Sequence, residues 1–198
     1  MLSDAKALAV LGRLEAPWRV QEFLNRLPYD HDDGCVSPLN VVRERKANCL
    51  EGALFAAACF RLSGRPPLIA DLRAFRDDDH VIAAFREGAL WGAVSKSSFI
   101  TLEYREPAYR SLRELVMSYF DFYIDGRARI SLREYSRPMD LRRFGDGWIT
   151  SEKDVGYIGG RLDETAHYLL VKKGTRLKKK DSALLERTWT ARPPKKQG

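Results

Sequence analysis

The chain has 198 residues, of which 44% are hydrophobic and 31% are charged, as in an ordinary folded domain. No apolar run approaches the roughly 20 residues that span a bilayer, so we expect no membrane partner. The three cysteines match no zinc pattern, and the N-terminus lacks a basic region followed by an apolar one. We therefore expect a reduced, cytoplasmic protein without a metal or other cofactor.

The formal net charge of +7 is concentrated at the C-terminal end. Residues 172–198 contain ten Lys or Arg and two Asp or Glu, a net charge of +8, whereas the other residues have a net charge of −1. We expect one domain over residues 1–171 and a basic, flexible tail over residues 172–198. Such a tail is usually only solubilising, and binding of nucleic acid or an acidic partner is the less common alternative.

Apolar spacing at the N-terminal end predicts helices over residues 4–14 and 18–27, separated by Pro17. A third helix is expected from Pro38 to about residue 45.

Residues 47–62 form the most helix-like segment of the chain. Asn48 is a good N-cap and Glu51 follows three residues later, a variant of the capping box. The segment 50–60 is rich in Ala and Leu and almost uncharged, which predicts a central, buried helix.

Three strands are expected next, over residues 68–75, 80–86 and 89–95, with Glu87-Gly88 as a two-residue turn. An amphipathic helix is expected over residues 111–123. Beyond it the pattern is weaker, and residues 148–150 and 168–172 are expected to form either short strands or packing segments.

Two residues in this arrangement suit thiolate chemistry. Cys49 falls in the first turn of its helix, where unpaired backbone amides and the helix dipole lower a thiol pKa. His80 begins a strand and can serve as the base. A buried structural cysteine and a hydrogen-bonded strand-end histidine are the alternatives, and each is the commoner role of such a residue taken alone.

The expected hairpin places a third residue beside His80. If Glu87-Gly88 is the turn, His80 lies directly opposite Ser95, and the two side chains share one face of the sheet. Ser95 thus stands where a carboxylate usually orients the histidine. A nearby carboxylate from the Asp77–Asp79 run is an alternative, and Lys96 would oppose an imidazolium charge.

Residues of about 40–100 resemble the transglutaminase-like superfamily. The resemblance rests on Cys49-Leu-Glu-Gly-Ala, Arg61-Leu-Ser-Gly, Asp79-His80-Val81 and the hairpin with Trp91. It implies a papain-like α+β fold in which a central Cys-bearing helix packs on an antiparallel sheet, with extra helices N-terminal to the sheet and after it. Members of the superfamily include protein-glutamine crosslinkers, peptidases and peptide N-glycanases.

The resemblance makes Cys49 the nucleophile and His80 the base, and it aligns Ser95 with the family's Asp. We expect an acyl-transfer or amide-hydrolysing enzyme acting on a peptide or protein. A non-catalytic peptide- or protein-binding module of the same fold is the alternative, because serine supplies no negative charge to an imidazolium.

Overall fold

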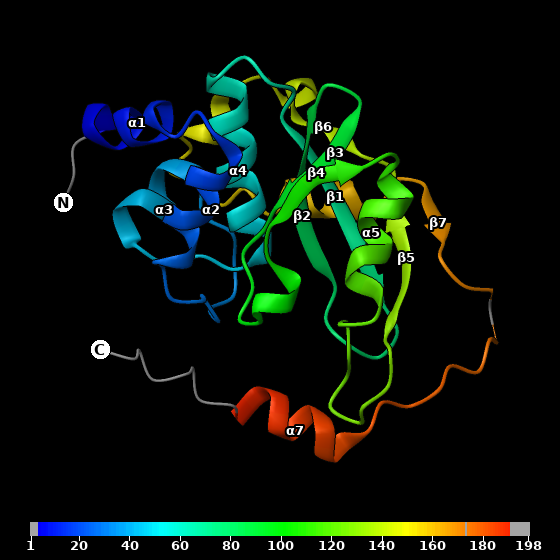
Figure 1. Ribbon diagram of the computed structural model, residues 1–198. Helices are drawn as coiled ribbons and strands as arrows, with labels where there is room; N and C mark the ends of the chain where they lie inside the picture. Colours follow the sequence, from blue (N-terminus) through cyan, green and yellow to red (C-terminus); the bar gives the residue numbers. More distant parts are fainter. Residues whose placement is uncertain (1–3, 173, 191–198) are drawn as a thin grey trace, which may run out of the picture.

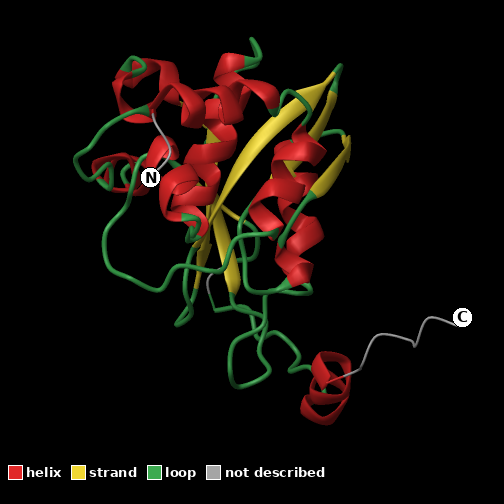
Figure 2. Ribbon diagram, turned by 90° about the vertical axis from the view of Figure 1, so that its left-hand side faces the viewer, coloured by secondary structure: helices red, strands yellow, loops and turns green. Residues whose placement is uncertain are grey.

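The computed structural model describes residues 4–172 and 174–190 of the chain. Its fold is α+β, with an antiparallel sheet between two layers of helices (Figures 1 and 2). The α-helices are α1 Asp4–Arg13, α2 Pro17–Asn25, α3 Pro38–Glu44, α4 Cys49–Leu62, α5 Leu112–Phe120, α6 Tyr157–Asp163 and α7 Ser182–Thr190. The strands are β1 Leu68–Ala74, β2 His80–Glu87, β3 Leu90–Val94, β4 Arg105–Tyr109, β5 Leu132–Ser136, β6 Met139–Asp140 and β7 His167–Leu169.

The strands are ordered β4-β3-β2-β1-β5-β7, with β6 paired to β1, and every pairing is antiparallel. Short 3₁₀-helices cover Ile100–Leu102, Leu141–Phe144 and Gly147–Ile149. The last of these shows that residues 148–150 are a packing segment and not a strand, because Trp148 and Ile149 are buried.

Helix α4 occupies the centre of the molecule, as its uncharged sequence predicts. Its residues from Glu51 to Phe60 are all buried, packed by α1–α3 on one side and by β2 on the other. A second apolar cluster lies on the opposite face of the sheet, beneath α5. Figure 1 shows α1–α4 and α5 on opposite sides of β1 and β2. The sheet therefore carries α4 on one face and α5 on the other, and the candidate residues lie at one end of this layered core.

The register of the β2–β3 hairpin differs from the expected one. Glu87 pairs with Leu90 and Ala83 with Val94, so the turn is Gly88-Ala89 and not Glu87-Gly88. The reason is conformational, because Gly88 has φ +58° and a tight hairpin turn needs such a residue at its first central position. The prediction that His80 pairs directly with Ser95 is therefore wrong, and the ladder ends at Val94.

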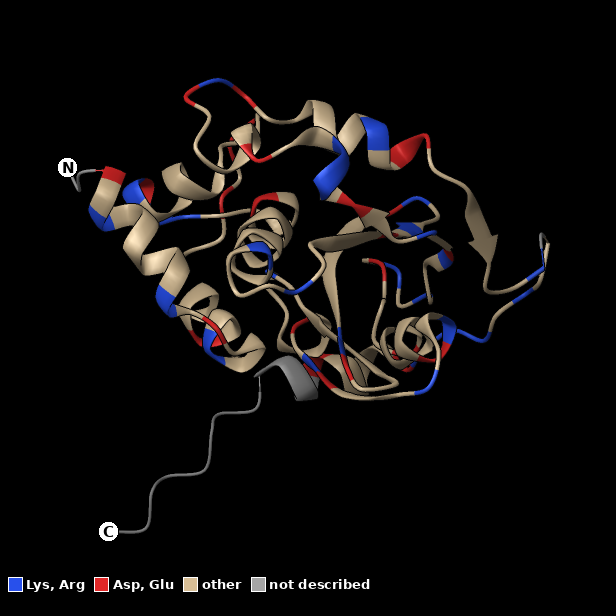
Figure 3. Cartoon of the chain, turned by 90° about the horizontal axis from the view of Figure 1, so that it is seen from above, with Lys and Arg blue, Asp and Glu red and all other residues tan. Residues whose placement is uncertain are grey.

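The C-terminal segment contains more structure than the sequence suggests. Helix α7 lies within the region expected to be a flexible tail, with Asp181 accepting hydrogen bonds from the amides of Ala183 (2.9 Å) and Leu184 (3.1 Å) at its N-terminus. Figure 3 shows the basic residues before it spread along the segment that follows β7. Residues 191–198 of the expected tail lie outside the described residues. Across the described segments, every helix is too short or too polar to cross a bilayer.

Candidate active site

The first turn of α4 is fixed by a complete capping box. Asn48 has extended backbone angles, and its Oδ1 accepts the Glu51 amide at 3.0 Å. In return, Glu51 Oε2 accepts the Asn48 amide at 2.8 Å, and its Oε1 accepts the Val36 amide at 2.8 Å. The capping role predicted for Glu51 is confirmed, and Cys49 is the first residue of the helix.

The surroundings of Cys49 act on its thiol in two opposing directions. The backbone amides of Val81, Leu50 and Cys49 itself, together with the Tyr29 hydroxyl, lower the thiol pKa by hydrogen bonding. Burial is the larger effect and raises the pKa above the ordinary value. The sequence makes a buried structural cysteine the commoner role and an activated thiolate the alternative, and the burial in the structure favours the protonated thiol because it raises the pKa.

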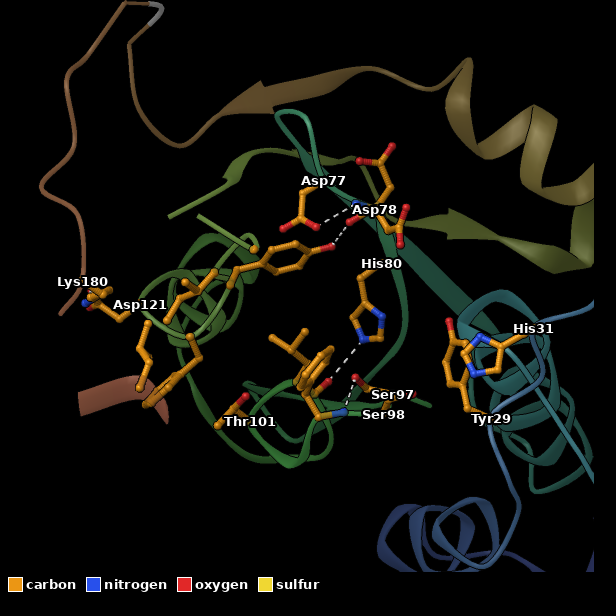
Figure 4. A pocket seen from close by; sticks show the side chains of 18 residues that line it. Tyr29, His31, Asp77, Asp78, His80, Ser97, Ser98, Thr101, Asp121 and Lys180 are labelled. Carbon is orange, nitrogen blue, oxygen red and sulfur yellow. Dashed lines mark hydrogen bonds and ion pairs between the residues drawn. The ribbon is translucent and has the colours of Figure 1, made fainter. Parts of the chain in front are cut away.

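His80 is almost completely buried, at 5% exposure, and one of its ring nitrogens is oriented by the backbone. Nε2 lies 3.2 Å from the carbonyl oxygen of Leu102. Because a carbonyl oxygen only accepts, Nε2 carries the hydrogen and Nδ1 has the free lone pair. Figure 4 shows this second nitrogen turned toward the side of the cavity on which Tyr29 lies.

Burial lowers the pKa of His80 to about 4, and the nearby Arg105 guanidinium adds to the effect, against the opposing influence of the Leu102 carbonyl. The imidazole is therefore neutral at pH 7. Val81, the residue after His80, supplies the amide beside the Cys49 thiol. The thiol and the imidazole thus belong to neighbouring positions at one end of α4 and β2.

Ser95 reaches His80 indirectly, through a shared acceptor. Its hydroxyl donates to the Leu102 carbonyl at 2.7 Å, the same oxygen that accepts from His80 Nε2. A peptide carbonyl therefore takes the position at which the resemblance implies a carboxylate. Because Ser95 uses a second lone pair of that oxygen, the carbonyl is a weaker partner for an imidazolium than a carboxylate would be.

Gln21 holds the backbone of Ser95 and was missed by the sequence analysis. Its Nε2 donates to the Ser95 carbonyl at 2.8 Å, and its Oε1 accepts the Ser95 amide at 3.0 Å. Gln21 is buried on α2 beside Val20 and Leu24. An amide side chain within the apolar stripe of a helix is the sequence signal that points to such a buried partner.

Lys96, the residue after Ser95, is directed away from the imidazole. It is buried at 4% exposure, and its ammonium donates to the Leu27 carbonyl at 2.6 Å. The Cβ atom of Lys96 also lies against Gly52 of α4, where an added methyl group would be only 2.4 Å from it. Gly52 therefore allows the first turns of α4 to approach the end of β3.

A cavity of about 830 Å³ opens beside His80 (Figure 4). Tyr29 and His31 line one side of it, and the run Asp77–Asp79 lines another. Two of the aspartates are occupied elsewhere, because Asp77 accepts from Ser131 Oγ and Asp79 from the Ala74 amide, each at 2.6 Å. Within the described part of the chain, no carboxylate hydrogen-bonds to His80.

A buried pair of His167 on β7 and Asp71 on β1 was also not predicted from the sequence. His167 Nε2 is 3.0 Å from Asp71 Oδ2, and its Nδ1 is 2.8 Å from the Thr165 carbonyl. The ring can donate to Asp71 through Nε2 or to the Thr165 carbonyl through Nδ1, according to its tautomer. Asp71 interrupts the apolar run of β1, which is the signal that could have indicated a buried partner.

Comparison with known proteins gives little further information. No protein-family model and no curated protein matches the chain. Among solved structures, Legionella pneumophila LapG is similar with a TM-score of 0.36 and 15% identity, over 46% of this chain and 60% of that one. An EGTA-treated form of LapG gives a TM-score of 0.35 and 13% identity, over 52% and 67% of the two chains. At these scores the function has to be argued from the site itself.

Proposed function

We propose that residues 1–171 form a transglutaminase-like cysteine enzyme that hydrolyses or transfers acyl groups of peptide or protein substrates. Cys49 is its nucleophile and His80 its general base. One observation carries the proposal: the thiol stands at the capped N-terminus of a buried helix, against the amide of the residue that follows an oriented histidine.

The proposed reaction uses only these two side chains and backbone amides. Cys49 Sγ attacks the substrate carbonyl carbon while the thiol proton passes to His80 Nδ1. The carbon–nitrogen bond then breaks, and the imidazolium returns the proton to the leaving amine, which gives a thioester. Water, or an amine in the case of transfer, attacks the thioester with His80 again accepting its proton, and Cys49 leaves as the thiol.

Two features of the helix terminus support this chemistry. The amides of Cys49 and Leu50 have no backbone carbonyl partner within the helix and face the resting thiol, and once the sulfur has reacted such groups can stabilise the oxyanion of the tetrahedral intermediate. The Leu102 carbonyl fixes the tautomer of His80 that leaves Nδ1 available as a base.

A non-catalytic binding module is the second candidate, and the charge state of the pair favours it. Burial raises the thiol pKa and lowers the imidazole pKa, so forming the thiolate–imidazolium pair is unfavourable in the resting state. The group that orients His80 is a neutral carbonyl, and among the described residues no carboxylate hydrogen-bonds to the ring to offset this cost. An enzyme would have to overcome this cost on substrate binding, whereas a binding module would not.

Acylation by p-nitrophenyl acetate separates the two candidates. For the enzyme, we expect one acetyl group per chain on Cys49, found by intact-protein and peptide mass spectrometry. The acylation rate should fall about 100-fold or more in His80→Gln, the usual contribution of a general base. Cys49→Ala serves as the control for the buried Cys35 and Cys59. Equal rates in the wild type and His80→Gln would contradict a catalytic pair.

A second experiment tests the role given to Ser95. Ser95→Asp places a carboxylate beside the Leu102 carbonyl, close enough to His80 to favour the imidazolium. We expect the His80 pKa to rise from about 4 and the acylation rate to increase, with Ser95→Asn as the uncharged control of similar shape. An unchanged His80 pKa by NMR titration would show that Ser95 does not communicate with His80.

A further inference from the structure

The C-terminal segment 174–186, here called the strap, crosses the end of the cavity that contains His80. Lys180 attaches it through two bonds: its amide donates to the Ala128 carbonyl at 2.8 Å, and its ammonium donates to Asp121 Oδ1 at 2.8 Å. Lys180 and Leu185 both line the cavity. Figure 4 shows the Lys180–Asp121 pair at the end of the cavity opposite Tyr29 and His31.

The charges of the cavity and the strap are complementary. Four carboxylates line the cavity, those of Asp77–Asp79 and Asp121, and Lys180 is the single Lys or Arg among its described lining residues. The cavity wall without the strap therefore has a charge of −4. The strap contributes three further basic residues, Arg176, Lys178 and Lys179, and two acidic ones, Asp181 and Glu186, so that with Lys180 its formal net charge is +2.

The apolar surfaces are complementary as well. Phe122 and Ile124 line the cavity beside Asp121, and Leu185 of the strap lines it too. Leu185 is half-buried, whereas most of the neighbouring residues of the strap are exposed. The contact thus combines a basic residue with a leucine five positions later, against an acidic and apolar wall.

The strap is held weakly enough to be displaced. Asp121 is 68% exposed and Lys180 is 33% exposed, and an ion pair in such a position adds little stability. Leu184 remains 58% exposed and Leu185 is only half-buried, so residues 182–186 bury little apolar surface. Segments with few buried contacts open most readily.

We propose that the cavity beside His80 binds peptide segments in which basic residues precede apolar ones, and that the strap occupies this site in cis. The strap then limits access to the cavity, and a basic peptide in trans competes with it. The inference extends the proposed function by naming the class of peptide that reaches His80. The experiments below measure peptide binding and release of the strap, neither of which needs the Cys49 reaction. They can therefore be repeated in Cys49→Ala, and a negative result would not bear on the catalytic proposal.

Hydrogen exchange of the full chain tests the attachment. In Asp121→Lys, we expect amide exchange over residues 175–186 to rise about fivefold, because an ion pair is replaced by repulsion. The charge-swapped double variant Asp121→Lys/Lys180→Glu should return exchange toward the wild-type rate. Asp146→Lys, which removes a comparably exposed pair with Arg61, is the matched control and should leave the strap unchanged. Wild-type exchange in Asp121→Lys, or no recovery in the double variant, would overturn the proposal.

A labelled synthetic peptide of residues 174–186 tests the site. Fluorescence anisotropy should show tighter binding to the full chain carrying Lys180→Glu, whose own strap is released, than to the wild type. Addition of Asp121→Asn to that variant removes a carboxylate of the wall without recreating an ion pair, and it should weaken binding of the peptide, as should replacing the three consecutive lysines of the peptide by glutamate. Equal binding of the two peptides would mean that the acidic wall does not select basic segments.

Discussion

Acidification should destabilise this protein through His80 before most of its carboxyl groups titrate. The ring is 5% exposed, and burial lowers its pKa to about 4, whereas an unfolded chain has a histidine pKa near 6.5. Between these values the unfolded state binds the proton and the folded state does not. The stability from His80 is therefore present above pH 6.5 and is lost as the pH falls toward 4.

The size of the effect follows from the two pKa values. A shift from 6.5 to about 4 corresponds to about 3 kcal/mol over the whole window, and to about 2 kcal/mol between pH 7 and pH 5. Four carboxyl groups act in the opposite sense, because partial or complete desolvation raises the pKa of Glu51, Asp71, Asp79 and Glu103. The pH dependence of the wild-type unfolding free energy therefore contains all of these contributions. The contribution of His80 is obtained by subtracting the pH dependence of a variant that lacks it.

His80→Gln provides that difference. The glutamine amide can still donate to the Leu102 carbonyl but has no titrating proton. We expect the unfolding free energy of the wild type, measured in urea, to fall by about 2 kcal/mol more than that of His80→Gln between pH 7 and pH 5. His31→Gln, the same substitution at an exposed position, is the matched control. A difference below about 0.5 kcal/mol for His80→Gln would refute a buried, neutral His80.

Two further substitutions test the packing around the site. Gly52→Ala should lower the unfolding free energy in urea by about 1–3 kcal/mol, because the new Cβ would lie 2.4 Å from that of Lys96. Gly160→Ala on α6 is the control: its Cβ would meet nothing within 4 Å, so it should be neutral or slightly stabilising. No loss in Gly52→Ala would mean that α4 does not approach β3 so closely. Asp71→Leu should lower the unfolding free energy by about 1–3 kcal/mol, because His167 loses its buried partner. Asp71→Asn keeps a hydrogen-bonding group and should lower it less. Equal losses in the two variants would show that the hydrogen bond is not the cause.

The features predicted correctly from the sequence are mostly local. The cap at Asn48, the reciprocal bond from Glu51 and the buried helix α4 depend on residues a few positions apart. The strands β1, β2 and β3 were recognisable from their apolar runs for the same reason. The hairpin register was predicted incorrectly, because two adjacent turn positions were open and only the positive φ of Gly88 decided between them.

The sequence by itself thus determined an α+β chain with a cysteine at a capped helix terminus and a histidine at the start of a strand. Only the tertiary structure decided what surrounds them. The Leu102 carbonyl is shared by His80 and Ser95, Gln21 hydrogen-bonds to the backbone of Ser95, and the strap lies over the cavity. These contacts join residues up to 74 positions apart, as in the Gln21–Ser95 pair. The pKa values of Cys49 and His80 follow from burial, and burial is a property of the packed molecule, because it depends on how many segments distant in sequence exclude water from the same place.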